Sequence, residues 1–220
     1  MRLVAEDVQY RYAGSDHAVL SGLACDVPSG TSAAILGPSG SGKTTLLTVL
    51  GGLLAPQSGS FYCVDENGQR HVPRSVSTWV LQTVSLLPDR SVIDNTALGA
   101  YLDGWGVAEA KARAIAALAD MGLADRAEAP AKVLSGGEAQ RVAIARALAS
   151  DRPILFADEP TGQLDADTTD RVLGFMLGSA RRTVVLVTHD ETAAARCDLV
   201  LKLRGGALVE IDRTVLRDAG

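Results

Sequence analysis

Three short, uncharged and almost wholly apolar runs constrain the fold of this 220-residue chain more than any other feature. They occupy residues 32–36, 154–157 and 184–187, and turn-forming or polar residues follow each run. A strand buried on both faces of a parallel sheet has such a continuous apolar sequence, because helices cover both faces. Helical patterns follow two of the runs, which indicates the strand–helix units of an α/β fold. The sequence therefore predicts a mainly parallel sheet as the core.

Weaker patterns predict strands at both ends of the chain. Residues 3–10 and 23–27 alternate loosely between apolar and polar positions, as half-buried strands do, and we expect them to form an N-terminal antiparallel part. Residues 199–203 and 207–211 flank Gly205-Gly206 and predict a closing strand–turn–strand.

The middle of the chain has a different character. Between residues 87 and 148 the pattern is helical, most clearly in the alanine-rich stretch 107–121. We therefore expect one domain over residues 1–220, with a core at about 1–83 and 151–220 and an inserted helical subdomain at about 84–150.

Composition excludes some partners. The net charge of −5 argues against a broad basic surface for nucleic acid, so no nucleic-acid partner is expected. The uncharged stretch 44–64 is interrupted by Gly51-Gly52 and by Pro56, whereas a membrane span needs about 20 predominantly apolar residues. We expect a helix ending near Leu54 and a strand at 61–64 instead, and a membrane role then requires a partner chain.

A phosphate-binding loop follows the first apolar run. Residues 37–44 read Gly-Pro-Ser-Gly-Ser-Gly-Lys-Thr, which matches G-x-x-x-x-G-K-[ST] between a buried strand and a predicted helix at 45–54. Glycines let backbone N–H groups surround phosphates, Lys43 adds a positive charge at the β- and γ-phosphates, and the Thr44 hydroxyl is a Mg²⁺ ligand. The loop predicts nucleotide binding.

Acidic and polar residues end the other apolar runs. Asp158 is placed to hold the shell of Mg²⁺, and Glu159, which points to the other side of the strand, is placed to act on a water. His189 follows the run 184–187 and is suited to contact a γ-phosphate or Glu159. Gln82 follows another short apolar run, and its amide suits both Mg²⁺ and the attacking water.

Residues 134–141, Leu-Ser-Gly-Gly-Glu-Ala-Gln-Arg, predict a helix start. Ser135 and Glu138 have the spacing of a capping box, and Gly136 and Gly137 leave the first turn open. Such a helix end, with free N–H groups and the positive end of its dipole, favours an anion.

These motifs, in this order, resemble the nucleotide-binding domain of ATP-binding cassette (ABC) proteins over nearly the whole chain, from about residue 3 to 211. The resemblance implies an α/β P-loop NTPase with an ABC-ATPase core, hydrolysing ATP with Mg²⁺. It implies catalytic roles for Glu159 and His189, and Mg²⁺ ligands at Thr44, Gln82 and Asp158. The nucleotide-binding residues that it implies are Tyr12, Gly37, Pro38, Ser39, Gly40, Ser41, Gly42, Lys43, Thr44, Thr45, Gln82, Ser135, Gly136, Gly137 and Asp165. By the same resemblance, Tyr12 would be the aromatic residue that stacks on adenine, with Tyr10 as the competing choice.

The resemblance also implies partners. Two copies would pack head to tail, so that ATP on one phosphate loop is covered by Ser135, Gly136 and Gly137 of the other copy. The closure of this pair would be transmitted to an integral membrane permease at the cytoplasmic face of the membrane. The chain would thus act as the ATPase subunit of a transporter or exporter. The alternative is an ATP-driven mechanical or regulatory switch that acts on a membrane partner in cell-wall or lipoprotein remodelling, without moving a solute.

Local strings narrow the resemblance within the family. Leu86-Leu87-Pro88, Asp94-Asn95 and the stretch 158–165 are similar to the bacterial group of lipoprotein-release, macrolide- or peptide-export, haem-export and cell-division ATPases. Gln163 departs from the Asn that is usual there, and Thr31 and Ala139 depart from a common Glu and Gln. Gln163 is expected to alter contacts of the loop that contains Asp165.

Overall fold

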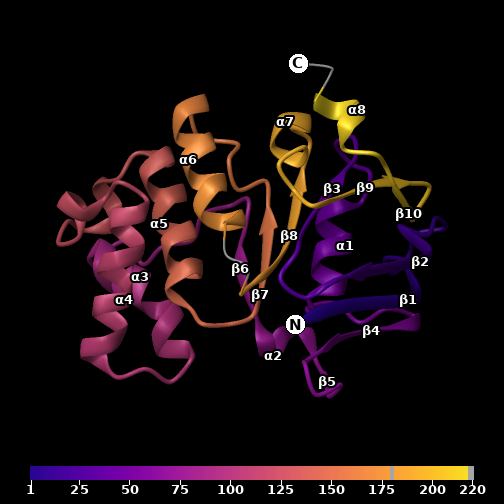
Figure 1. The fold of residues 1–220 in the computed structure, drawn as a ribbon, viewed down its shortest axis with the longest axis horizontal. Helices are drawn as coiled ribbons and strands as arrows, with labels where there is room; N and C mark the ends of the chain where they lie inside the picture. The colour runs from indigo at the N-terminus through magenta and orange to yellow at the C-terminus, as the bar shows by residue number, and fades with distance from the viewer. Residues whose placement is uncertain (179–180, 218–220) are drawn as a thin grey trace. The chain divides into compact units, whose positions relative to one another are not determined.

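The computed structural model describes residues 1–178 and 181–217, which divide into two compact units (Figure 1). Unit 1 contains Met1–Ser77, Pro153–Glu159 and the described residues after 180. Unit 2 contains Thr78–Arg152 and Pro160–Gly178. The strand β6 (Ser77–Val80) crosses the boundary between them.

An antiparallel sheet forms the N-terminal part of unit 1, as predicted. Its order is β2-β1-β4-β5, with the bounds β1 Arg2–Tyr10, β2 Leu20–Val27, β4 Ser58–Val64 and β5 Arg70–His71. The pairing of β1 is irregular around Asp7, whose φ of 48° lies in the left-handed region. Gly59 is required opposite this irregularity, because a Cβ there would lie 2.3 Å from the Asp7 carbonyl oxygen.

The core sheet of unit 1 is mainly parallel and buried. Its strands run in the order β10-β9-β3-β8-β7, where β3, β7, β8 and β9 are parallel and β10 pairs antiparallel with β9. Their bounds are β3 Ser32–Leu36, β7 Ile154–Asp158, β8 Thr183–Thr188, β9 Leu199–Arg204 and β10 Ala207–Glu210. Every residue of β3, β7 and β8 is buried, which confirms the interpretation of the three apolar runs.

The helices of unit 1 are short. They are α1 Lys43–Leu50, α2 Pro73–Val76, α7 Glu191–Ala194 and α8 Thr214–Arg217. The helix α1 packs against β7 and β8 and buries Leu46 and Leu50. It begins and ends earlier than the predicted stretch 45–54, because Gly51 caps its last turn and the left-handed Gly52 turns the chain.

Unit 2 is mainly helical (Figure 1). Its helices are α3 Val92–Leu102, α4 Val107–Asp120, α5 Gly136–Ala149 and α6 Ala166–Leu177, with 3₁₀ turns η1 Ala124–Arg126 and η2 Ala131–Val133. The helices α3, α4 and α5 pack on one another. A Cβ at Gly99 of α3 would lie 2.0 Å from the Arg146 carbonyl oxygen of α5, so this glycine permits the close approach of the two helices.

The division does not match the predicted core and helical subdomain throughout, and the predicted boundaries stay a prediction. The sequence predicts residues 78–83 and 160–178 in the core, but both stretches belong to unit 2, where residues 160–178 group with α5. The Gln140 side chain donates to the Pro160 carbonyl oxygen at 2.9 Å, which holds this segment against α5. No helix in the described part of the chain has the length and apolarity to cross a membrane.

Candidate active site

The phosphate loop joins the carboxyl end of β3 to the start of α1. Gly42 precedes the helix in a left-handed conformation, with φ of 97°, and a Cβ there would lie 2.6 Å from Val19 Cγ1. Within the described residues, no side chain caps the amino end of α1, and its first turn contains no acid. The backbone N–H groups and the positive end of the helix dipole thus face an anion without a competing carboxylate on the helix.

Two polar side chains of the loop lie inside it. Lys43 is buried, and its Nζ donates to the carbonyl oxygens of Gly37 at 2.7 Å and Pro38 at 3.1 Å. The buried Oγ of Ser41 has no partner among the residues that the structure describes. A Cβ at Gly37 would lie 2.7 Å from this Oγ, so a larger residue there would displace the Ser41 hydroxyl. A positive charge and an unpaired hydroxyl suit phosphate oxygens.

Thr44 and Asp158 come together at the carboxyl edge of the sheet, as the sequence predicted. Thr44 Oγ1 donates to Asp158 Oδ2 at 2.8 Å, and Asp158 is only 4% exposed. Burial raises the pKa of Asp158 above its ordinary value, and the nearby Glu159 charge adds to the rise, against the hydrogen bond from Thr44. Asp158 Oδ1 is buried without a partner in the described chain.

The side-chain oxygens of Thr44 and Asp158 are suitable ligands for Mg²⁺. A hydroxyl and a carboxylate are hard oxygen ligands, and the unpaired Oδ1 is an oxygen with unmet capacity. The described residues contain no group of three or more His, Cys, Asp or Glu side chains arranged for a metal. Mg²⁺ suits such a site, because it usually keeps several waters and binds through one or two carboxylates and substrate phosphates.

Glu159 and His189 form a second pair on the same edge. His189 Nδ1 lies 2.9 Å from both carboxylate oxygens of Glu159, and a carboxylate only accepts, so Nδ1 carries the proton. The Glu159 side chain is 13% exposed, whereas that of His189 is 71% exposed. Thr188 Oγ1 donates weakly to Glu159 Oε2 at 3.4 Å. Asp158 and Glu159 thus have different partners, as predicted, but strand alternation is not the cause, because Glu159 lies just beyond β7 with a left-handed φ of 46°.

Tyr12 and Tyr10 differ in accessibility. Tyr12 is 48% exposed and Tyr10 is 8% exposed, and their rings meet edge to face with centroids 5.1 Å apart. The Tyr12 hydroxyl lies 2.9 Å from Thr45 Oγ1, within hydrogen-bond distance, so the ring is held beside α1. Of the two tyrosines, Tyr12 has the ring surface that a planar base needs for stacking. Its predicted role stays a prediction.

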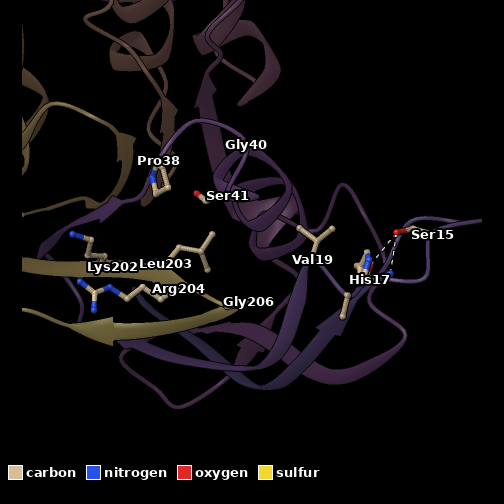
Figure 2. Close-up of a pocket in the computed structure, with 12 residues that line it drawn as sticks. Ser15, His17, Val19, Pro38, Gly40, Ser41, Lys202, Leu203, Arg204 and Gly206 are labelled. Atoms are coloured by element: carbon tan, nitrogen blue, oxygen red, sulfur yellow. Dashed lines mark hydrogen bonds between the residues drawn. The ribbon is translucent and has the colours of Figure 1, made fainter.

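A pocket of about 750 Å³ lies beside the phosphate loop (Figure 2). Pro38, Gly40 and Ser41 line it from the loop, and Lys202 and Arg204 line it from β9. These two cations were not singled out from the sequence. Their alternation with the apolar Leu203 at the end of a predicted strand was the available signal. They increase the positive potential beside the loop.

The predicted capping box is present in unit 2. Ser135 caps α5, Glu138 N donates to Ser135 Oγ at 3.3 Å, and Ser135 N donates to Glu138 Oε2 at 2.9 Å. Gly136 and Gly137 form the first turn, where a Cβ would meet Gln163 at 2.8 Å and 3.2 Å respectively.

Two further predicted residues also belong to unit 2. Asp165 caps α6, because its Oδ1 accepts from Thr168 N at 2.9 Å. Gln82 is exposed in the bend that follows β6. The predicted nucleotide contacts of Gln82, Asp165, Ser135 and the two glycines stay predictions.

Comparisons with known proteins agree with this geometry. A family model described as "ABC transporter" matches residues 20–162. The chain is 38% identical to the lipoprotein-releasing system ATP-binding protein LolD of Hyphomonas neptunium, and the match covers 96% of each chain. It is 37% identical to the pyoverdine export ATP-binding/permease protein PvdT of Pseudomonas aeruginosa over 92% of this chain, but it spans only 32% of that protein.

Solved structures show the same fold. The dimeric structure of MJ0796, a bacterial ABC transporter cassette, matches with a TM-score of 0.85 and 29% identity, covering 96% of this chain and 98% of that one. A post-hydrolysis state of the same cassette, bound to ADP and Pi, also matches with a TM-score of 0.85, at 28% identity and the same coverage.

The buried parallel sheet, the phosphate loop at its edge and the paired carboxylates define a P-loop nucleotide hydrolase. The match of the family model and the identity to LolD then specify it further: the chain belongs to the ABC transporter family. It is an ATP-binding subunit of a transporter system and an ATPase, and membrane association follows from that role.

Proposed function

We propose that this chain hydrolyses Mg²⁺-ATP as one half of a head-to-tail pair, and that closure of the pair drives a permease at the cytoplasmic face of the membrane. The observation that carries the proposal is the arrangement of two side-chain pairs at the carboxyl edge of the core sheet, where the phosphate loop begins. These pairs are Thr44 with Asp158 and Glu159 with His189. Dimeric cassettes among the structural matches support the pairing.

The roles of the residues follow from their environments. Lys43 and the N–H groups at the start of α1 bind the β- and γ-phosphates, and Tyr12 stacks on adenine. Glu159 orients the attacking water or accepts its proton, and His189 holds the Glu159 carboxylate in place. Thr44, Asp158 and Gln82 would hold Mg²⁺, which neutralises charge on the β- and γ-phosphates when it is bound.

The second copy completes the site. Its Ser135, Gly136 and Gly137 present a helix end to the γ-phosphate, and its Asp165 lies in the loop expected to face the first copy. By their names, LolD takes part in lipoprotein release and PvdT takes part in pyoverdine export. These relatives favour a transport or release system for this chain over a switch that moves no solute.

The substitution Glu159→Gln tests the proposal. The glutamine amide still accepts a hydrogen bond from His189, but it is a far weaker acceptor for a proton, so kcat should fall by at least about 100-fold. ATP binding should persist, and a stable ATP-bound pair should accumulate in size-exclusion chromatography with light scattering. Glu66→Gln in an exposed turn is the matched control and should hydrolyse ATP like the parent. Parent-like turnover in Glu159→Gln would contradict the role of Glu159.

A further inference from the structure

Gln140 of α5 is a buried side chain that the proposed function leaves without a role. It is 1% exposed, and its Nε2 donates to the Pro160 carbonyl oxygen at 2.9 Å. Its Oε1 is buried without a partner among the described residues. A buried carboxamide with one unmet oxygen is costly to the fold. The hydrogen bond to the Pro160 carbonyl oxygen is the one polar interaction that this side chain makes within the described residues.

The same two segments meet again at the start of α5. We call residues 160–165 the crossing segment. A Cβ at Gly136 would lie 2.8 Å from Gln163 Oε1, and a Cβ at Gly137 would lie 3.2 Å from the Gln163 carbonyl oxygen. The crossing segment also contains its own turn, in which Leu164 N donates to the Thr161 carbonyl oxygen at 3.0 Å. It therefore lies against the start of α5 and is hydrogen-bonded to this helix one turn further along.

Glu159 immediately precedes the crossing segment and is the last residue of its stretch in unit 1. Its N–H donates to the Val187 carbonyl oxygen at 2.9 Å, and its side chain contacts His189. Its φ of 46° lies in the left-handed region, which is unfavourable for a side chain of this size and more so before a proline. Such a conformation persists only where the surrounding structure holds both sides of the residue.

We propose that Gln140 is a positioning residue for hydrolysis, which holds the Pro160 carbonyl to α5 and thereby sets the backbone of Glu159 from its second side. Strand β8 holds the first side through Val187. Under the proposed function, the γ-phosphate that engages the first turn of α5 belongs to the other copy, and it would then act on the segment to which Glu159 is covalently joined. The inference rests on the proposed function, in which Glu159 acts on the attacking water.

The substitution Gln140→Met tests this role. Methionine has nearly the shape of glutamine and no donor, so it removes the bond to Pro160 together with the unmet oxygen. The Pro160 carbonyl oxygen loses its donor, which costs stability, whereas removal of the unmet glutamine oxygen is favourable, so the thermal midpoint should fall by only about 2–4 °C. We expect kcat to fall about tenfold or more, since small misplacement of a reacting group is enough for such a loss. KM for ATP and nucleotide affinity should not change, because the phosphate loop is untouched.

Ile144→Val is the matched control, because it trims a fully buried side chain one turn further along α5 and should keep the parent kcat. Parent-like kcat in Gln140→Met, or an equal loss in Ile144→Val, would overturn the positioning role. Glu159→Gln separates the two proposals. If that variant also hydrolyses ATP normally, the proposed function fails; if it is inactive while Gln140→Met is not, only the present inference fails.

Hydrogen exchange on the parent protein provides a test that does not depend on how a variant folds. If α5 and the crossing segment form one piece, the amide of Leu164 and the amides of the first turns of α5 should open with a common rate. Opening of the crossing segment while α5 stays protected would overturn the inference.

Discussion

At the scale of single residues, adjacent carboxylates acquire different chemistry from their surroundings. Asp158 is buried beside Thr44 with one oxygen unpaired, and burial raises its pKa. Glu159 instead meets the exposed His189. Asp158 is therefore suited to binding a cation, and Glu159 is suited to orienting a water molecule or accepting a proton.

Asp158→Asn should stabilise the nucleotide-free, metal-free protein while abolishing Mg²⁺-dependent hydrolysis. The change neutralises a buried group with an unmet oxygen, and a gain of 1 kcal/mol corresponds to about 2–4 °C in the thermal midpoint of a chain this long. Thermal melts with EDTA at neutral pH measure the shift, and Asp16→Asn in an exposed loop is the control. A lower midpoint in Asp158→Asn would show that the carboxylate is compensated without metal.

The contacts of Asp158 with Thr44 and of Glu159 with His189 could be expected from the sequence, whereas the roles of these residues stay predictions. Asp158, Glu159 and His189 follow buried strands, so their meeting at one sheet edge follows from the order of the elements. Gln140 gave no such signal, because a glutamine in a helix is ordinarily a solvated residue. Its burial depends on Pro160, twenty positions later, and only the tertiary structure places the two together.

At the scale of elements, Asp103 joins the ends of two helices of unit 2. It follows α3 and accepts hydrogen bonds from Ser150 Oγ at 2.7 Å, Asp151 N at 2.7 Å and Arg152 Nε at 2.9 Å, just beyond α5. Burial opposes ionisation of this carboxyl, but these donors outweigh it and hold its pKa below the ordinary value.

Asp103→Asn should therefore destabilise the protein at neutral pH by about 1–3 kcal/mol, since hydrogen bonds to a charged group are lost. A lowered folded-state pKa contributes stability above the unfolded-state value, and that contribution disappears as the pH falls through the folded-state value. The difference from the parent should thus shrink below about pH 4. Urea unfolding across pH measures it, with exposed Asp120→Asn as the control; a difference that is constant with pH would contradict the charged interaction.

Element boundaries were predictable where local chemistry sets them. The stretch 107–121 corresponds to α4, Val107–Asp120, because its alanine-rich pattern favours a helix, and the capping box marks the start of α5. The helix α1 is shorter than the predicted one because Gly51 and Gly52 end it. The grouping of residues 160–178 with α5 depends on tertiary contacts and had no local signal.

At the scale of the whole molecule, the predicted site residues form two groups, one in each unit. The phosphate loop, Asp158, Glu159 and His189 belong to unit 1, whereas Ser135, Gly136 and Gly137 belong to unit 2. Under the proposed function, the second group serves the ATP of another copy. Damage to it should therefore spare nucleotide binding by the single chain.

Gly136→Asp should retain ATP binding by the single chain and lose hydrolysis by about 100-fold. An acid in the first turn of α5 interacts favourably with the helix dipole, so the fold should persist, but its charge repels a γ-phosphate. Nucleotide titration and turnover measure the two properties, and Gly136→Ala, whose Cβ meets only the movable end of Gln163, should lose less. Parent-like hydrolysis in Gly136→Asp would show that the start of α5 does not meet the nucleotide.

The strand that carries the phosphate loop has both of its neighbours late in the chain. β3 pairs only with β8 and β9 in the described sheet, so a nascent chain has no partner for this strand until residues 183–188 of β8 have been synthesised. Domains generally fold as units during synthesis, and long-range pairings form late. The ability to bind ATP is therefore acquired only after β8 has been synthesised, and truncated chains that lack β8 are not expected to compete for nucleotide.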